Sequence, residues 1–148
     1  MAESKYVIFK LGNERYGLPI ESVEQILPAQ QLTKVAKAPK VMLGVFELRG
    51  KSIPTIDTRL RLELPEGLDS RNFVLVFTEN GRCALRVDHV EGIVAFQEEE
   101  IDGGARLLND KIDEVLSGVA KRGEELTVLL DPMRLVPKQL KPKVEKAA

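Results

Sequence analysis

Apolar and polar residues alternate, or apolar residues gather in short runs, over most of the chain, a pattern typical of β-strands. Residues 5–11 are rich in β-branched and aromatic side chains, and a turn leads from them to a return strand over residues 15–19. Residues 72–78 form the clearest strand. Asn80-Gly81 then predicts a tight hairpin, because both residues tolerate a positive φ, and the return strand runs over residues 82–94 with a bend at Gly92.

Two further hairpins are expected, each followed by a short helix. One joins two short strands at Arg49-Gly50-Lys51, where Gly50 suits a turn that needs a positive φ, and Asp57 then caps a helix. The other joins residues 115–121 to residues 126–130, and Asp131-Pro132 opens the last helix, which runs to Val136.

A helix is also predicted over residues 21–27, because Ile20, Val23 and Ile26 recur at helical spacing and Pro28 ends the run. Residues 31–36 are expected to add another short strand. The chain as a whole offers many short strands and no regular alternation of strand and helix. This favours a mostly β protein, with an antiparallel barrel or barrels rather than a parallel sheet.

The segment from Gly44 to Arg59 reads Gly-Val-Phe-Glu-Leu-Arg-Gly-Lys-Ser-Ile-Pro-Thr-Ile-Asp-Thr-Arg. It resembles the signature of the CheW-like domains, the coupling proteins of bacterial chemotaxis, which is glycine, hydrophobic, Asn-Leu-Arg-Gly, hydrophobic, Pro, hydrophobic, Asp-Leu-Arg. The opening from Phe9 to Ile26, the pair Ala38-Pro39, the strand from Leu85 to Val94 and the run Leu129-Leu130-Asp131 resemble further parts of the family pattern. The resemblance covers roughly residues 5–136.

The resemblance implies two small five-stranded, SH3-like barrels packed on a shared hydrophobic core, with short helices. We expect one such domain over residues 1–136, divided near residues 64–72, with an N-terminal strand that crosses between the halves. The tail over residues 137–148 is rich in lysine and is expected to be flexible.

The resemblance also implies partners and the residues that contact them. In the family, the helical tip of a membrane chemoreceptor docks in a groove, and a CheA-type histidine kinase packs against the barrels. The receptor-binding positions are Val23, Gln25, Ile26, Glu47, Arg49 and Gly50, and the kinase-binding positions are Met42, Leu43 and Phe46. The residues themselves leave open whether Arg49 binds a partner or braces its own loop, and whether Val23 and Ile26 form interface or core.

The sequence departs from the family pattern in three places. Gln25 stands where Glu is frequent, Glu47 where Asn is usual, and Thr55 and Thr58 where hydrophobic residues are usual. Changed charges alter partner choice more than affinity. We therefore expect the fold to be kept, with the receptor, the kinase and the pathway left open.

Composition narrows the function further. The chain has 148 residues, a net charge of −1 and 5% aromatic residues, which disfavours a nucleic-acid-binding barrel. No N-terminal run resembles a signal peptide, and no segment approaches the roughly 18 apolar residues of a membrane span. These features predict a cytoplasmic protein that reaches the membrane only through a partner.

No catalytic or metal-binding arrangement is evident. The only histidine, His89, follows Asp88, and strand alternation sends the two side chains to opposite faces. Cys83 is interpreted as a small buried hydrophobe, and Glu98-Glu99-Glu100 with Asp102 as a solvated acidic loop. We expect no enzyme activity, no cofactor and no metal.

Two function hypotheses remain. The first is a non-catalytic adaptor that couples a chemoreceptor to a histidine kinase in a two-component signalling array. The second is a small-ligand-binding or sensory module that uses the groove between the barrels as a pocket.

Overall fold

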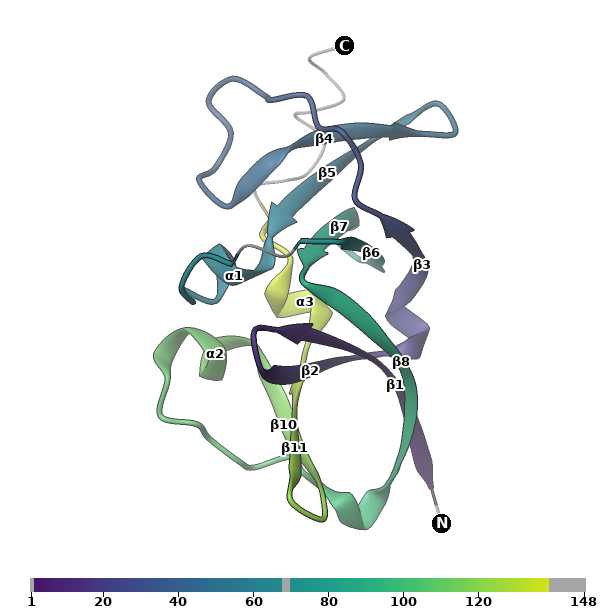
Figure 1. Ribbon diagram of the computed structural model, residues 1–148, viewed down its shortest axis with the longest axis vertical. Helices are drawn as coiled ribbons and strands as arrows, with labels where there is room; N and C mark the ends of the chain where they lie inside the picture. Colours follow the sequence, from purple (N-terminus) through teal and green to yellow (C-terminus); the bar gives the residue numbers. More distant parts are fainter. Residues whose placement is uncertain (1, 68–69, 139–148) are drawn as a thin grey trace.

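The computed structural model describes residues 2–67 and 70–138, and in this part of the chain most residues lie in short strands. The strands form two curled sheets, of order β8-β1-β2-β11-β10-β9 and β3-β6-β7-β5-β4 (Figure 1). Their bounds are β1 Glu3–Leu11, β2 Glu14–Pro19, β3 Val23–Pro28, β4 Met42–Leu48, β5 Lys51–Asp57, β6 Asn72–Thr78, β7 Gly81–Val87, β8 His89–Gln97, β9 Ile101–Asp102, β10 Leu116–Arg122 and β11 Glu125–Leu130. The prediction of a mostly β protein is confirmed, and the predicted tail from residue 139 onward lies outside the described residues.

The predicted hairpins are present. Strands β1 and β2 meet at Leu11 and Glu14, and β6 and β7 meet at Thr78 and Gly81, where Gly81 has a φ of 101°. The hairpins β4–β5 and β10–β11 also form, and each leads into a short capped helix. Turn chemistry is local, so it was readable from the sequence.

The helix predicted over residues 21–27 is wrong. A single turn of 3₁₀-helix, η1 (Ile20–Ser22), leads instead into the strand β3, which pairs antiparallel with β6. A seven-residue helix has little stability of its own, whereas pairing with β6 satisfies the backbone of this segment. Residues 31–36 form no strand beyond one bridge between Thr33 and Val45.

The strand predicted over residues 82–94 is divided at Asp88. Its first part is β7, in the five-stranded sheet, and its second part is β8, in the six-stranded sheet. The chain therefore changes sheets at η1 and again at Asp88. Residues 64–72, where a subdomain division is predicted, connect two strands of the same sheet, so the division into subdomains stays a prediction.

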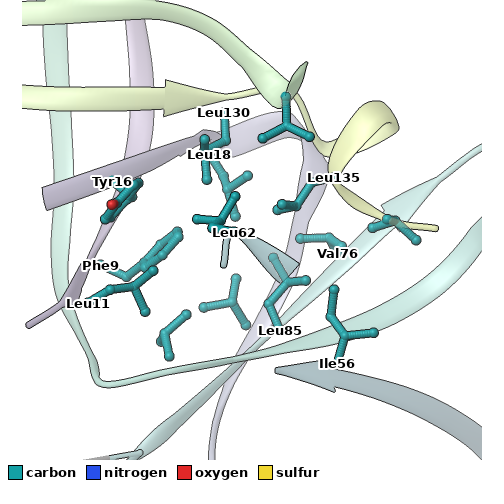
Figure 2. Close-up of a cluster of buried hydrophobic side chains, with 14 of the residues drawn as sticks. Phe9, Leu11, Tyr16, Leu18, Ile56, Leu62, Val76, Leu85, Leu130 and Leu135 are labelled. Atoms are coloured by element: carbon teal, nitrogen blue, oxygen red, sulfur yellow. The ribbon is translucent and has the colours of Figure 1, made fainter. Parts of the chain in front are cut away.

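The main hydrophobic core lies between the two sheets. Figure 2 shows Phe9, Tyr16 and Leu18 of the six-stranded sheet packed with residues of the five-stranded sheet such as Ile56 and Leu85. Smaller clusters fill the inside of each curled sheet: Phe46, Ile53, Phe73, Leu75 and Ala84 in one, and Ile8, Phe96, Ala120 and Leu129 in the other. Each sheet thus has its own interior in addition to the shared core.

Short helices close this core. Helix α1 (Thr58–Arg61) begins at Asp57 and α3 (Pro132–Leu135) at Asp131, and each aspartate accepts a hydrogen bond from a backbone N–H of its helix. Both helices were predicted. Helix α2 (Asp110–Val115), the 3₁₀ turn η2 (Glu98–Glu100) and the short strand β9 were not, because each is too short to show a periodic pattern and most of their residues are acidic.

Candidate partner-binding surface

The β4–β5 hairpin presents Arg49 at its tip. Leu48 pairs with Lys51, so Arg49 and Gly50 form a two-residue turn with φ angles of 51° and 81°. Both angles are positive, as in the mirror-image turns that match the twist of paired strands, and the expectation for Gly50 is confirmed. A non-glycine residue in this conformation costs roughly 1–2 kcal/mol, so the turn holds Arg49 at an energetic disadvantage.

The side chain of Arg49 is exposed and forms no hydrogen bond or ion pair within residues 2–67 and 70–138. Its guanidinium therefore keeps its donors available to another molecule. The neighbouring Glu47 and Lys51 are exposed as well. The alternative that Arg49 braces its own loop has no contact to support it.

The arginine that does brace the fold is Arg59, on α1. It donates from Nε to Asp88 Oδ1 at 3.0 Å, from Nη2 to Asp88 Oδ2 at 2.6 Å, and from Nη1 to the Pro65 carbonyl at 2.7 Å. Gly12 adds a backbone N–H to Asp88 Oδ2 at 2.6 Å. Burial raises the pKa of Asp88, but the hydrogen bonds from Arg59 and Gly12 outweigh it and hold this pKa below its ordinary value. This pair joins α1 to the β1–β2 turn and to the point where the chain changes sheets.

The predicted receptor-binding residues of the N-terminal part lie on β3, not on a helix. Val23 is partly buried against the main core, Gln25 is half-buried, and Ile26 is 41% exposed. The intervening Glu24 faces outward, as expected from the alternation of side chains along a strand, and the pairing with β6 has a register shift between Val23 and Gln25.

Strand β3 and the Arg49 hairpin meet at one end of the five-stranded sheet. They border a hollow of about 140 Å³. The residues that line it are Glu24, Leu48, Arg49, Lys51, Ile53 and Arg82. The structure therefore brings Arg49 close to the strand that carries Gln25 and Ile26. The resemblance had grouped these residues as one receptor-binding set, but no local pattern of residues indicates their proximity, because the two segments are separated by more than twenty residues.

Three residues of this region were missed by sequence reasoning. Arg82 forms an ion pair with Glu24 at 2.8 Å, and its guanidinium lies over the ring of Phe77, 5.6 Å from the ring centre. Phe77 is 58% exposed. The hairpin signal at Asn80-Gly81 located Arg82 and Phe77 opposite each other, but their exposure depends on where the sheet ends.

The predicted kinase-binding residues differ in accessibility. Met42 is 9% exposed and belongs to the main core, and Phe46 is 6% exposed and belongs to the cluster inside the five-stranded sheet. Leu43, in contrast, is half-buried. A partner would contact Leu43 directly. Met42 and Phe46 would affect binding only indirectly, through the residues that pack over them. The assignment of these three residues stays a prediction.

The groups with potential reactivity are inert in this arrangement. Cys83 is 1% exposed, and burial raises the pKa of its thiol to about 12. His89 is exposed while the adjacent Asp88 is buried, as strand alternation predicted. Within residues 2–67 and 70–138, no group of three or more metal-ligating side chains is found, and no helix is long and apolar enough to cross a membrane.

Comparison with known proteins decides the family. A profile of the CheW-like domain matches residues 5–140. The chain belongs to the CheW-like domain family. Its curated relatives are named chemotaxis protein CheW, and a solved relative is titled a scaffolding protein, which bears out the prediction that the chain is not an enzyme.

Individual CheW-like relatives agree in length as well as in sequence. The chemotaxis protein CheW of Klebsiella aerogenes is 30% identical over 134 residues, which cover 89% of this chain and 81% of that protein. The CheW protein of Treponema pallidum is 28% identical over 135 residues, covering 87% and 79%. The crystal structure of the scaffolding protein TtCheW from Thermoanaerobacter tengcongensis superimposes with a TM-score of 0.81 at 28% identity, covering 90% and 92% of the two chains.

Proposed function

We propose that this CheW-like protein is a chemotaxis-type adaptor that couples a membrane chemoreceptor to a CheA-type histidine kinase. Its relatives are named as chemotaxis and scaffolding proteins, and its site offers binding groups without catalytic ones. The protein then acts in the cytoplasm and is recruited to receptor arrays by its partners.

The observation that carries the proposal is the free Arg49 beside β3. An arginine held in a strained turn, without any internal partner among the described residues, fits a contact with another protein better than a structural role. Ile26, on the same strand as Glu24, supplies an exposed apolar contact, and Gln25 and Glu47 supply polar ones. This combination suits the helical tip of a receptor, in which apolar residues give affinity and polar ones set the register.

The kinase contact is assigned to the neighbouring surface at Leu43, which is supported from beneath by Met42 and Phe46. Two partners can then occupy different parts of the protein at the same time. Because both sheets share one core, displacement at one surface is transmitted through packed side chains.

The experiment is a pull-down with the chemoreceptor and the CheA-type kinase encoded in the same genome. Arg49→Glu should weaken receptor capture at least tenfold and leave kinase capture and the melting temperature nearly unchanged. Lys121→Glu, which reverses an exposed charge on the β10–β11 hairpin, is the matched control and should leave receptor capture intact. Equal loss in both variants, or capture of neither partner by the wild type, would refute the proposal.

The alternative of a small-ligand module has less support. The hollow of about 350 Å³, lined among others by Ile8, Phe96 and Arg122, lies within the six-stranded sheet rather than in a groove between the sheets. Native mass spectrometry of protein purified from cells distinguishes the two, since a retained small molecule favours the alternative.

A further inference from the structure

The six-stranded sheet curls without closing, and the larger of the two hollows described above lies in its open part. Strand β8 forms one edge of this sheet and, within residues 2–67 and 70–138, pairs only with β1. Residues of β8 and residues of the β10–β11 hairpin both line the hollow. Its volume of about 350 Å³ falls within the range of roughly 300–1,000 Å³ that is usual for small-molecule sites. The hollow is therefore large enough for a small organic molecule.

The inner lining of this hollow is apolar. Ile8 of β1 and Phe96 of β8 line it, and both belong to the cluster inside the curled sheet. Gly92, which pairs with Ile8, leaves space here, because a Cβ at this position would meet no heavy atom within 4 Å apart from its chain neighbours. An apolar group of a ligand can therefore lie against Ile8 and Phe96 and exclude water from them.

A buried hydroxyl group without a partner also lines the hollow. Thr127 is 4% exposed, and its side chain lies on the same face of β11 as Leu129, which packs inside the sheet. Its hydroxyl forms no hydrogen bond with any other residue that the structure describes. Buried polar groups in proteins are nearly always hydrogen-bonded. The Thr127 hydroxyl therefore indicates that a polar group of a ligand belongs beside it.

The charges around the hollow favour a cation over an anion. Arg15 pairs with Glu91 at 2.9 Å and with Glu125 at 2.8 Å, and Arg122 binds Glu100 through two hydrogen bonds of 2.8 and 2.9 Å. Three carboxylates thus face two guanidinium groups. Both guanidinium groups already donate to carboxylates, whereas each carboxylate oxygen has a further lone pair to accept with. An anionic ligand would compete with these glutamates, and an ammonium group would not.

We propose that this hollow binds a small amphipathic amine. Its apolar body lies against Ile8 and Phe96, and its ammonium group donates hydrogen bonds to the Thr127 hydroxyl and to the carboxylate of Glu125, which shares a face of β11 with Thr127. The site lies inside one sheet and apart from Arg49, so it adds to the adaptor role and does not depend on it. A ligand of this size binds weakly and exchanges during purification.

Thermal unfolding with three probes of similar shape tests the class of ligand. Phenethylamine is the cation, phenylethanol its neutral counterpart and phenylpropionate the anion, all at about 10 mM and equal ionic strength. Phenethylamine should raise the melting temperature by about 3–5 °C, as expected for a ligand at ten times its dissociation constant. Phenylethanol should give less than half of this shift, and phenylpropionate none. No shift with the amine, or an equal shift with the anion, would overturn the proposal.

Variants of the lining test the contacts. Glu125→Gln should weaken phenethylamine binding about fivefold or more, whereas Glu124→Gln, at the neighbouring exposed residue that does not line the hollow, is the matched control and should bind as the wild type does. Thr127→Val keeps the shape of the side chain without the hydroxyl. It should unfold at an equal or higher temperature and yet lose at least half of the shift caused by the amine. Equal effects of Glu124→Gln and Glu125→Gln, or an unchanged shift in Thr127→Val, would refute these contacts.

Backbone amide NMR spectra locate the bound probe. Phenethylamine should shift the resonances of Gly92 and Thr127 most, and the variant Arg49→Glu should show the same shifts as the wild type. The amine site and the proposed receptor contact can therefore fail independently. Shifts centred on Leu48 and Arg49, which line the smaller hollow, would place the amine elsewhere and overturn the proposal.

Discussion

Replacement of Arg49 by glycine separates the two roles that an arginine in this turn could have. The φ of 51° at Arg49 costs an L-residue roughly 1–2 kcal/mol, whereas glycine adopts it freely and loses about 0.5–1 kcal/mol more in backbone entropy on folding. The side chain has no polar contact with another described residue. Arg49→Gly should therefore leave the free energy of unfolding unchanged or raise it by up to about 1 kcal/mol.

Urea unfolding of the wild type and the variant, with receptor capture measured in parallel, provides the assay. Gly50→Ala is the matched control: its Cβ would meet nothing within 4 Å, so its expected loss of about 1 kcal/mol reflects backbone strain at a φ of 81° alone. The expected outcome for Arg49→Gly is weaker receptor capture at equal or greater stability. A loss of stability above about 1 kcal/mol would show that Arg49 holds the fold together, and the reasoning about a free guanidinium would fail.

Three further predictions concern buried polar groups. Thr55 and Thr58 have buried hydroxyl groups without a hydrogen-bond partner among the described residues, so Thr55→Val and Thr58→Val should each raise the free energy of unfolding by about 1 kcal/mol. A lower free energy of unfolding, measured in urea, would mean that the hydroxyls are satisfied. The folded-state pKa of Asp88 lies below its unfolded value of about 4, so the stability it contributes is present above that pH and is lost as the pH falls through the folded-state pKa. Asp88→Asn should accordingly be less stable at pH 7 and lose less stability between pH 5 and pH 3, and an unchanged acid slope would contradict this. Cys83 should react with a thiol reagent only after unfolding, and labelling of the native protein at pH 8 at the rate of a free thiol would refute its burial.

The hairpins and capped helices were predictable because their determinants are a few residues apart. Gly81, Arg49 and Gly50 set turns through their own positive φ angles, and Asp57 and Asp131 cap helices that begin at the next residue. The segment over residues 21–27 was misassigned because its apolar spacing fits one turn or two of helix as well as an edge strand. Only pairing with β6, fifty residues away in sequence, decides between them.

The candidate site was predictable in part. The resemblance to the CheW-like domains directed attention to Arg49. The structure adds that this arginine has no hydrogen bond or ion pair with another described residue, while Arg59 is bound to Asp88. Glu24, Arg82 and Phe77 were missed because their proximity arises from two strand pairings, β3 with β6 and β6 with β7. The division expected near residues 64–72 lies between two strands of the same sheet, while the chain changes sheets elsewhere.

The sequence by itself determined the strand-rich character, the positions of the turns and the family of this protein, because these depend on side-chain alternation and on residues close together in the chain. Only the tertiary structure decided which hairpin joins which sheet, that Asp88 is buried against Arg59, and that Glu24 meets Arg82 beside Arg49. These features follow from the packing of two curled sheets on one core. Packing brings distant segments together through the summed burial of many side chains, and no short stretch of sequence encodes that sum.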